Sequence, residues 1–597
     1  MHDITEKRRR HVPTIFVRTI ARPDKRRRRR IWFNKATIPL ASFLVSTLAV
    51  THVPDAADVV VIGAGASGMC AAIAAHDAGA TTILIEKASE LGGTAAISGG
   101  VVWAPANGHM PAAERATDAA AALQYFLSLS PHLDREVLTA FVNGAGAAIE
   151  YLERSTPLRF AVLEGYPDYY LDRPGARAQG GRALDADLFD FRTLGEWRDR
   201  VFTGGSVLRL MLRETPLGGA TTAPSAQEFQ RRSDCDLRGF GQAVVGALLA
   251  GCLARGIEPW LNVSPRRLRI EDDRVVGVNV EVDGVGRMLH ARRGVILATG
   301  GFEWNEELVR TFLKGPLTHP ASPPQARGDG LKLAQRAGAA LGNMNSAWWT
   351  PTLTPTGERW PDGSPRSYPV LIERTLPGSI MVNRRGCRFC NEATNYSALS
   401  GAFHQFDPVT YDYANLPCWL IFDSLYKSRY AVGPAPPGAQ APEWMQSATS
   451  LDGLALSIGC DAAGLQRSVE QFNASVDQGH DAQFGRGGGI YDIFYGDRSR
   501  PGASGTLGRL EVPPYYAIPI TMGALGTNGG ARTDAHARVL NPDGEIIQGL
   551  FAAGNVMAAP TGSVYAGAGG TLGPALTFGC IAGRSAAMAV QRDASRH

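Results

Sequence analysis

The sequence has little charge and few cysteines for its length, which argues against several classes of protein. Charged residues make up 19% of 597 residues, against about a quarter in ordinary globular proteins. The eight cysteines lack the paired spacing of a disulfide framework, so a small secreted scaffold is not expected. Cys387 and Cys390 form a lone CxxC without a second ligand pair nearby. We therefore interpret them as structural and expect no metal site. The chain also has no internal repeat of fixed period.

The positive charge is concentrated at the N-terminus. The formal net charge is +4, but residues 1–53 hold 13 lysines and arginines against three acids, which leaves −6 for the rest of the chain. A nucleic-acid-binding surface in the folded body is therefore not expected. The apolar stretch Ile38–Val50 is too short to span a bilayer. We expect residues 1–53 to be a disordered basic leader or a mis-assigned start, with a twin-arginine-type export signal at Arg29 and Arg30 as the alternative.

The remaining composition is that of a soluble globular enzyme. Hydrophobic residues make up 44% of the chain, and its 69 glycines predict many tight turns and close approaches of the backbone to a ligand. The length favours two domains that share one active site. Because paired cysteines are missing, we expect a cytoplasmic protein that is at most peripheral to a membrane.

A βαβ unit of the Rossmann type is predicted near the start of the body. A β-branched strand at Asp58–Ile62 is followed by the sequence GAGASG and by an alanine-rich helix over Met69–Ala80. A second buried strand is expected at Thr81–Ile85. Glu86 follows it, 18 residues after Gly68, which is close to the distance at which an acidic residue binds a ribose hydroxyl.

Three glycines in this unit have separate tasks. Gly63 permits a tight turn, Gly65 lets the backbone approach a pyrophosphate, and Gly68 allows the helix to pack closely on the strand. A carboxylate at Glu86 would repel the 2′-phosphate of NADP, so NADP is not expected. This unit alone leaves NAD and FAD open.

Later segments indicate that the cofactor-binding domain is interrupted. Val275–Val282 and Leu289–Leu297 predict hairpin strands, and Gly549–Asn555 again resembles a strand that enters a cofactor loop. Residues 343–510 differ in composition from the segments before them, with many prolines and two adjacent tryptophans. We predict a cofactor-binding domain formed by residues 54–342 and 511–597, with a catalytic (cap) domain inserted at residues 343–510.

Glycine-rich loops spread over residues 56–590 resemble those of the fumarate reductase and 3-ketosteroid dehydrogenase flavoprotein superfamily. Examples are the sequences GGT at Gly92, SGG at Ser98, ATGG at Ala298 and LGP at Leu572. The resemblance implies FAD as the cofactor and an α/β fold, a Rossmann-type FAD-binding domain with an inserted α+β catalytic (cap) domain. The residues implied in FAD binding are Gly63, Gly65, Ala66, Ser67, Gly68, Glu86, Lys87, Gly92, Gly93, Thr94, Ser98, Gly99, Gly100, Ala298, Thr299, Gly300, Gly554, Asn555, Leu572 and Gly573.

Three further segments resemble the 3-ketosteroid Δ1-dehydrogenases in particular. That family has segments of the form PDYY, NExxPY and YPGPG. This chain has PDYY at Pro167–Tyr170, NEATNY at Asn391–Tyr396 and YAGAG at Tyr565–Gly569. The family's four functional positions are kept as Tyr169, Tyr396, Tyr565 and Gly569.

The resemblance implies a role for each of these four residues in the 1,2-dehydrogenation of a 3-ketosteroid. The Tyr565 hydroxyl and the Gly569 N–H would donate to the 3-keto oxygen and so make the α-proton acidic. Tyr396 would remove that proton from carbon 2 while flavin N5 accepts a hydride from carbon 1. Tyr169 would support the Tyr396 phenolate. The expected partners are a small apolar substrate (a 3-ketosteroid) and an electron acceptor such as a quinone.

Two alternative functions remain open. A fumarate-reductase-like flavoprotein, acting on a dicarboxylate or another enone, would have an arginine proton donor near the position of Tyr396. A flavin electron-relay module without a substrate would not need Tyr396. Ala566 and Ala568 in place of the family's prolines, and Asn395 before Tyr396, leave the reaction type intact but call the preference for steroids into question.

Overall fold

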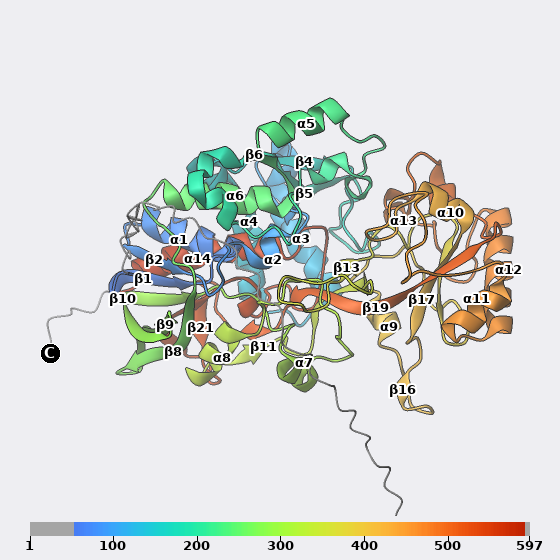
Figure 1. The fold of residues 1–597 in the computed structure, drawn as a ribbon. Coiled ribbons are helices and arrows are strands. Elements are labelled where there is room, and N and C mark those ends of the chain that lie inside the picture. The colour runs from blue at the N-terminus through green and yellow to red at the C-terminus, as the bar shows by residue number, and fades with distance from the viewer. Residues whose placement is uncertain (1–52, 591–597) are drawn as a thin grey trace, which may run out of the picture. The chain divides into compact units, whose positions relative to one another are not determined.

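The structure, a computed structural model that describes residues 53–590, contains two large sheets (Figure 1). All of the predicted leader except Val53 lies outside the described residues. No helix among residues 53–590 is long and apolar enough to cross a membrane. The first sheet has seven strands in the order β2-β1-β10-β22-β9-β8, with β21 paired to β22. The second has six, in the order β13-β12-β19-β17-β14, with β18 paired to β19.

Parallel strands form the centre of the first sheet. β1 (Ala56–Ile62) lies between β2 (Thr82–Ile85) and β10 (Val285–Leu297), and β10 pairs in parallel with β22 (Ile546–Ala552). Residues 59–61 of β1 are completely buried, as expected for a parallel strand that is covered on both faces. The strands that complete this sheet are β8 (Val263–Glu271), β9 (Arg274–Val282) and β21 (Arg538–Leu540).

Two glycine-containing helices pack tightly on this sheet and on each other. α1 (Ala66–Asp77) begins directly after the glycine turn and contacts α14 (Leu572–Met588). A Cβ on Gly68 would lie 1.8 Å from the carbonyl oxygen of Gly63, and a Cβ on Gly579 would lie 2.6 Å from the backbone of α1. Larger side chains are therefore excluded at the start of α1 and where α14 packs against it.

The second sheet is antiparallel. β12 (Ala347–Leu353), β17 (Cys418–Asp423) and β14 (Ser379–Asn383) are joined through the long strand β19 (Tyr515–Thr527). β19 begins beyond residue 511, where the sequence placed the return to the cofactor-binding domain, yet it pairs with both β12 and β17. We therefore propose that the cap extends to the end of β19. The predicted α/β class with an inserted α+β part is confirmed.

The remaining elements include β13 and β18 of the second sheet; the others lie outside the two large sheets. In the first part of the chain they are α2 (Gly93–Ala96), β3 (Val102–Trp103), α3 (Ala112–Leu129), α4 (Arg135–Ser155), β4 (Phe160–Glu164), β5 (Gly180–Ala186), β6 (Phe189–Asp190), α5 (Ala226–Asp234), β7 (Leu237–Arg238), α6 (Phe240–Leu253), α7 (Glu306–Phe312), α8 (Asp329–Arg336) and β11 (Leu341–Gly342). In the second part they are β13 (Tyr368–Pro369), α9 (Ser400–Phe403), β15 (Phe406–Asp407), β16 (Asp412–Tyr413), α10 (Ser424–Arg429), β18 (Gln446–Ala448), α11 (Leu451–Ile458), α12 (Ala462–Gln478), α13 (Ile490–Phe494) and β20 (Gly530–Ala531). Short 3₁₀ helices span Phe191–Arg200, Leu212–Glu214, Pro216–Gly218, Gly502–Gly505 and Gly554–Val556.

Candidate active site

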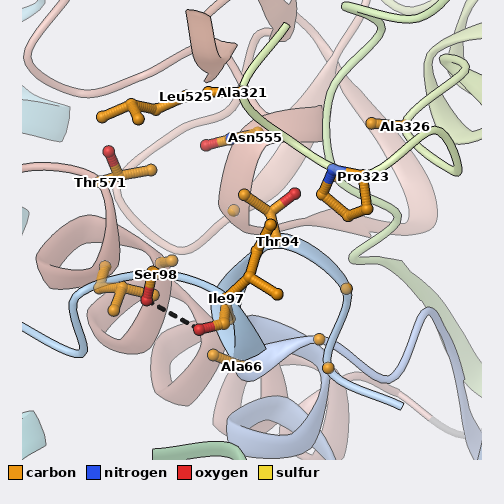
Figure 2. Close-up of a pocket in the computed structure, with 18 of the residues that line it drawn as sticks. Ala66, Thr94, Ile97, Ser98, Ala321, Pro323, Ala326, Leu525, Asn555 and Thr571 are labelled. Carbon is orange, nitrogen blue, oxygen red and sulfur yellow. Dashed lines mark hydrogen bonds between the residues drawn. The ribbon is translucent and has the colours of Figure 1, made fainter. Parts of the chain in front are cut away.

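A cavity of about 420 Å³ begins at the glycine turn after β1 and extends to residues of the second sheet. Figure 2 shows Thr94 and Ser98 lining it together with Asn555 and Leu525, which come from distant parts of the chain. Of the twenty residues predicted to bind the cofactor, eighteen line this cavity. The other two, Gly68 and Gly573, pack against backbone instead.

The predicted ribose-binding carboxylate lies where β2 ends. Glu86 Oε2 accepts a hydrogen bond from the Ala64 N–H at 2.9 Å, and Oε1 accepts one from the Ala88 N–H at 3.0 Å. These bonds orient the carboxylate on the wall of the cavity. Burial raises the pKa of Glu86 above its usual value, and the two N–H donors partly offset that effect.

The polar groups of this cavity fit an extended dinucleotide. Buried polar atoms of Thr299, Gln325 and Trp360 line the cavity and have no hydrogen-bond partner among the described residues. Buried polar groups are normally paired, so these atoms indicate a polar ligand. A Cβ on Gly93 or Gly300 would meet nothing within 4 Å, which leaves the backbone there open to a ligand. The N-terminus of α1 has no side-chain cap and can face a pyrophosphate.

The four predicted catalytic residues come together on the wall of the same cavity. Tyr169, Tyr396 and Tyr565 are at most 6% exposed. The Tyr169 hydroxyl donates to the Tyr396 hydroxyl at 3.1 Å. The rings of Tyr169 and Tyr565 stack with their centroids 5.8 Å apart, and those of Tyr396 and Tyr565 are 5.5 Å apart. Gly569 lies beside them on the cavity wall.

Hydrogen bonds from three segments hold the loop that contains Tyr565. The carbonyl of Ala566 accepts from the Tyr169 N–H at 2.9 Å and from the Tyr125 hydroxyl at 3.0 Å. The Trp103 N–H donates to the Gly569 carbonyl at 3.2 Å. These bonds fix the loop although the family's two prolines are missing from it.

Gly569 is suited to donate its N–H to a ligand. Its φ of +86° favours glycine, and a Cβ there would lie 2.5 Å from the backbone nitrogen of Trp103. Within residues 53–590 no acceptor is bonded to the Gly569 N–H. A carbonyl oxygen in the cavity can therefore receive it.

A buried ion pair supports the segment that contains Tyr169. Asp168 Oδ1 accepts from Trp103 Nε1 at 2.9 Å, and its Oδ2 accepts from Arg182 Nη1 at 2.7 Å. Arg182 is 1% exposed and also pairs with Asp118 at 2.8 Å. Because these charges are paired and hydrogen-bonded inside the protein, they tie the segment at Tyr169 to β3 and α3.

Burial makes the hydroxyls of Tyr396 and Tyr169 weaker acids than an exposed tyrosine. It raises the pKa of Tyr396 well above its usual value, the neighbouring Tyr565 raises it further, and the hydrogen bond from Tyr169 lowers it. Burial also raises the pKa of Tyr169, and a negative charge on Tyr396 would raise it further. Ionisation of Tyr396 therefore depends on groups that stabilise its phenolate.

The sequence did not identify several residues of this site. Tyr166, Tyr491 and Tyr495 pack with the three predicted tyrosines in one buried cluster. Trp348 joins this cluster, packs on Tyr565 at 5.4 Å and donates to Asn555 at 3.3 Å, whereas Trp349 belongs to the core of the second sheet. The position of Tyr166 just before the PDYY segment was a usable signal, and the two adjacent tryptophans stood out in residues 343–510; Tyr491 and Tyr495 had no such signal nearby.

A dinucleotide-binding turn and a tyrosine cluster on one cavity define a flavin-dependent oxidoreductase. The family model described as "FAD binding domain" matches residues 58–572, and the chain belongs to this family. Its cofactor is FAD, and the predicted resemblance to 3-ketosteroid dehydrogenases is confirmed at the level of homology.

Several relatives of this chain are, by their names, dehydrogenases of cyclic ketones. The 4-oxocyclohexanecarboxylate 2-dehydrogenase of Sinomonas cyclohexanicum is 39% identical over 89% of this chain and 92% of its own length. The 3-oxosteroid 1-dehydrogenase of Mycobacterium tuberculosis is 36% identical over 88% of this chain and 97% of its own. The crystal structure of 3-ketosteroid delta1-dehydrogenase from Sterolibacterium denitrificans in complex with 1,4-androstadiene-3,17-dione matches with a TM-score of 0.81 and 34% identity, over 89% of this chain and 100% of that one.

Proposed function

We propose that the protein introduces a double bond beside the carbonyl of a cyclic ketone, with 1,2-dehydrogenation of a 3-ketosteroid as the reaction. The observation that supports this best is that Tyr169, Tyr396, Tyr565 and Gly569 line the cavity that also holds the dinucleotide turn. Bound FAD supplies the two-electron acceptor, and a quinone-like acceptor then takes the electrons from the enzyme.

Two of these residues bind the ketone oxygen, and the other two act on the proton of the α-carbon. The Tyr565 hydroxyl and the free N–H of Gly569 donate to the ketone oxygen, where negative charge develops as the α-proton leaves. The hydroxyl oxygen of Tyr396 accepts that proton, and Tyr169 donates a hydrogen bond to this Tyr396 oxygen. The apolar side chains of Leu212 and Leu371 line the cavity and suit a hydrocarbon skeleton.

This cavity has fewer cationic groups than a dicarboxylate substrate would need. Lys87 and Arg366 are the lysine and arginine among its described lining residues. Lys87 is already hydrogen-bonded to Asp329. Two carboxylates would therefore compete for one available guanidinium, and a tyrosine stands where a fumarate-reductase-like enzyme would have its arginine proton donor.

A small cyclic keto acid is a second candidate substrate, and Arg366 is the observation that favours it. Its guanidinium stacks on Trp360 and Tyr368 at 4.9 and 5.2 Å and donates to the Gly204 carbonyl at 2.6 Å. No described carboxylate forms an ion pair with it. A guanidinium held in this way can bind the carboxylate of a substrate such as 4-oxocyclohexanecarboxylate, on which the 39% identical relative acts by name.

Anaerobic titration of the FAD-loaded protein tests the proposed function. A 3-keto-4-ene steroid is expected to bleach the oxidised flavin spectrum and to yield the 1,4-diene, while 4-oxocyclohexanecarboxylate tests the second candidate. Bleaching by the keto acid alone would assign the second candidate. If neither ketone bleaches the flavin and fumarate rapidly reoxidises the reduced protein, the enzyme is a dicarboxylate reductase.

Replacing Arg366 by glutamine tests the second candidate separately. If Arg366 binds a substrate carboxylate, Arg366→Gln should lower kcat/KM for the keto acid about 10–100-fold relative to the steroid, because a charge-assisted hydrogen bond is lost. Steady-state kinetics with both substrates measure the ratio. Arg384→Gln, at an exposed arginine paired with Asp412, is the control. An equal loss with both ketones, or loss of FAD, would contradict a role in carboxylate recognition.

A further inference from the structure

The Asn555 side chain lines the cavity between the start of α1 and the tyrosine cluster (Figure 2). The preceding residue, Gly554, packs so closely on α1 that a Cβ there would lie 2.6 Å from the hydroxyl oxygen of Ser67. On its other side, Asn555 contacts Trp348, whose ring packs on that of Tyr565. An FAD with its pyrophosphate at the N-terminus of α1 and its flavin at the tyrosines would therefore pass this side chain.

The orientation of the Asn555 amide follows from the chemistry of its partner. Trp348 Nε1 lies 3.3 Å from Asn555 Oδ1, and Trp348 is 2% exposed. An indole N–H can only donate a hydrogen bond, whereas one end of an amide accepts and the other donates. The amide oxygen must therefore face Trp348, and the other end is the NH₂ group. Within residues 53–590 no acceptor is bonded to Asn555 Nδ2, so a ligand in the cavity can accept from it.

The second sheet is irregular where it meets Asn555. Between Ala347 and Trp349 of β12 the pairing with β19 shifts by one residue, and β19 has the extra residue. Such bulges are common next to active sites, where they redirect side chains. Gly526 lies in this stretch of β19, and a Cβ there would lie 2.4 Å from Asn555 Nδ2. The amide can keep its place against β19 only because this residue is glycine.

A buried carboxylate lies close to the same glycine but does not bind the amide. A Cβ on Gly526 would lie 3.7 Å from Glu303 Oε1. Glu303 is 3% exposed and accepts hydrogen bonds from Ser322 Oγ at 2.7 Å and from the Thr527 N–H at 3.3 Å. Its carboxylate thus has donors of its own. The amide N–H of Asn555 remains available on the cavity side.

We propose that Asn555 donates its amide N–H to the flavin of bound FAD, and that Trp348 is the positioning residue that keeps the amide in this orientation. A flavin that accepts a hydride gains two electrons and one proton and becomes an anion. A hydrogen-bond donor at the ring stabilises that negative charge and so raises the reduction potential. The family supplies FAD, so the inference goes beyond the proposed function and does not depend on which ketone is oxidised.

The test is the reduction potential of the full-length FAD-loaded protein, measured by absorbance in equilibrium with a reference dye. Asn555→Leu keeps the approximate shape of the side chain and removes the donor. It is expected to lower the ratio of reduced to oxidised flavin at a given potential about tenfold, which is about 30 mV for a two-electron couple. Trp348→Phe keeps a ring against Tyr565 but removes the indole N–H. The amide can then turn over, so the same ratio should fall about three- to tenfold.

Trp349→Phe is the matched control, because it is the same substitution at the next residue of β12. The Trp349 ring packs on His404 and belongs to the core of the second sheet, so its replacement should leave the potential unchanged. FAD content and thermal stability of each variant are measured first.

The inference would be overturned by an unchanged or raised potential in Asn555→Leu, or by an equal fall in Trp349→Phe. An unchanged potential in Trp348→Phe alone would remove the positioning role. Loss of FAD from either folded variant would also count against the inference, because the proposed bond is one among many that hold the cofactor. No ketone enters this measurement, so its outcome is separate from that of the proposed function.

Discussion

Tyr396→Phe is expected to keep its FAD and to slow flavin reduction by a cyclic ketone about 10²–10⁴-fold, the usual contribution of a general base. The substitution removes the only oxygen of that side chain and leaves its ring, which packs against Tyr169 and Tyr565. The cavity should therefore keep its shape. Single-turnover reduction under anaerobic conditions, followed by the flavin absorbance, measures the loss directly.

Tyr151→Phe is a suitable control, because that hydroxyl bonds Asp77 on the surface. It should reduce at the normal rate. Normal reduction of Tyr396→Phe would contradict the proposed base and favour the electron-relay alternative, which needs no proton acceptor. Loss of FAD from this variant would show instead that Tyr396 is required for the structure of the site.

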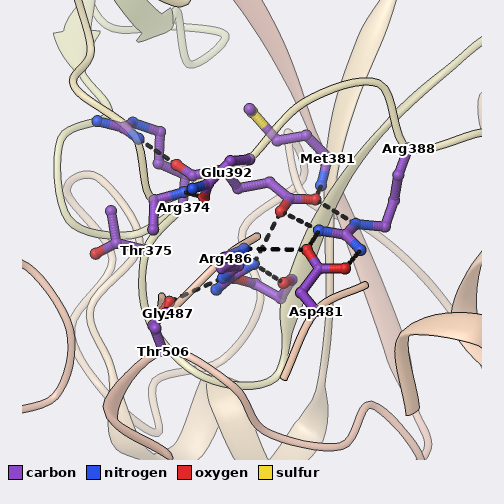
Figure 3. A network of polar contacts seen from close by, with 12 residues as sticks. Arg374, Thr375, Met381, Arg388, Glu392, Asp481, Arg486, Gly487 and Thr506 are labelled. Atoms are coloured by element: carbon purple, nitrogen blue, oxygen red, sulfur yellow. Dashed lines mark hydrogen bonds and ion pairs between the residues drawn. The ribbon is translucent and has the colours of Figure 1, made fainter. Parts of the chain in front are cut away.

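Glu392→Gln is expected to lower the free energy of unfolding by about 3–5 kcal/mol, as is found when one partner of a buried ion pair is removed. Glu392 is completely buried in the NEATNY segment. Its carboxylate accepts hydrogen bonds from Arg388 at 2.7 and 2.8 Å and from Arg486 at 3.3 Å, and Arg388 also pairs with Asp481 at 2.8 Å (Figure 3). Burial raises the pKa of Glu392, but the two guanidiniums outweigh it, so the net pKa is lowered.

Without the Glu392 charge, Arg388 would keep only Asp481 as an ion-pair partner, and the buried Arg486 guanidinium would have none among the described residues. Denaturant unfolding of the FAD-loaded protein measures the effect. Asp412→Asn provides the comparison, because that acid pairs with Arg384 on the surface, where both side chains are more than 40% exposed. It should cost less than about 1 kcal/mol. A similarly small cost for Glu392→Gln would contradict the view that this ion pair holds the segment that contains Tyr396.

The parts of the fold that could be predicted are those specified locally. The helix expected at Met69–Ala80 begins at Ala66, and the strands on either side of it agree closely with β1 and β2. Glycine spacing and runs of buried aliphatic residues act within a few positions of each other, so the sequence alone reveals them. The same holds for the cavity residues next to the ends of these strands. The contacts of individual residues with FAD, and the roles of the four catalytic residues, stay predictions.

The parts that could not be predicted depend on contacts between distant segments. β19 lies at the centre of the second sheet because strands from 168 and 97 positions earlier in the chain, β12 and β17, pair with it. Tyr166 and Tyr495 are 329 positions apart and still share a hydrogen bond. No spacing rule connects such residues.

Tyr169 forms hydrogen bonds both to the loop that contains Tyr565 and to the proposed base, Tyr396. Tyr169 donates its hydroxyl to Tyr396 and its backbone N–H to the Ala566 carbonyl. These bonds therefore set the distance between the proposed proton acceptor and the proposed carbonyl donors, and they make the three segments one unit. Attempts to engineer this enzyme for new ketones should leave that unit alone and change the apolar walls, because the separation of carbonyl and α-carbon is the same in a single ring and in a fused ring system.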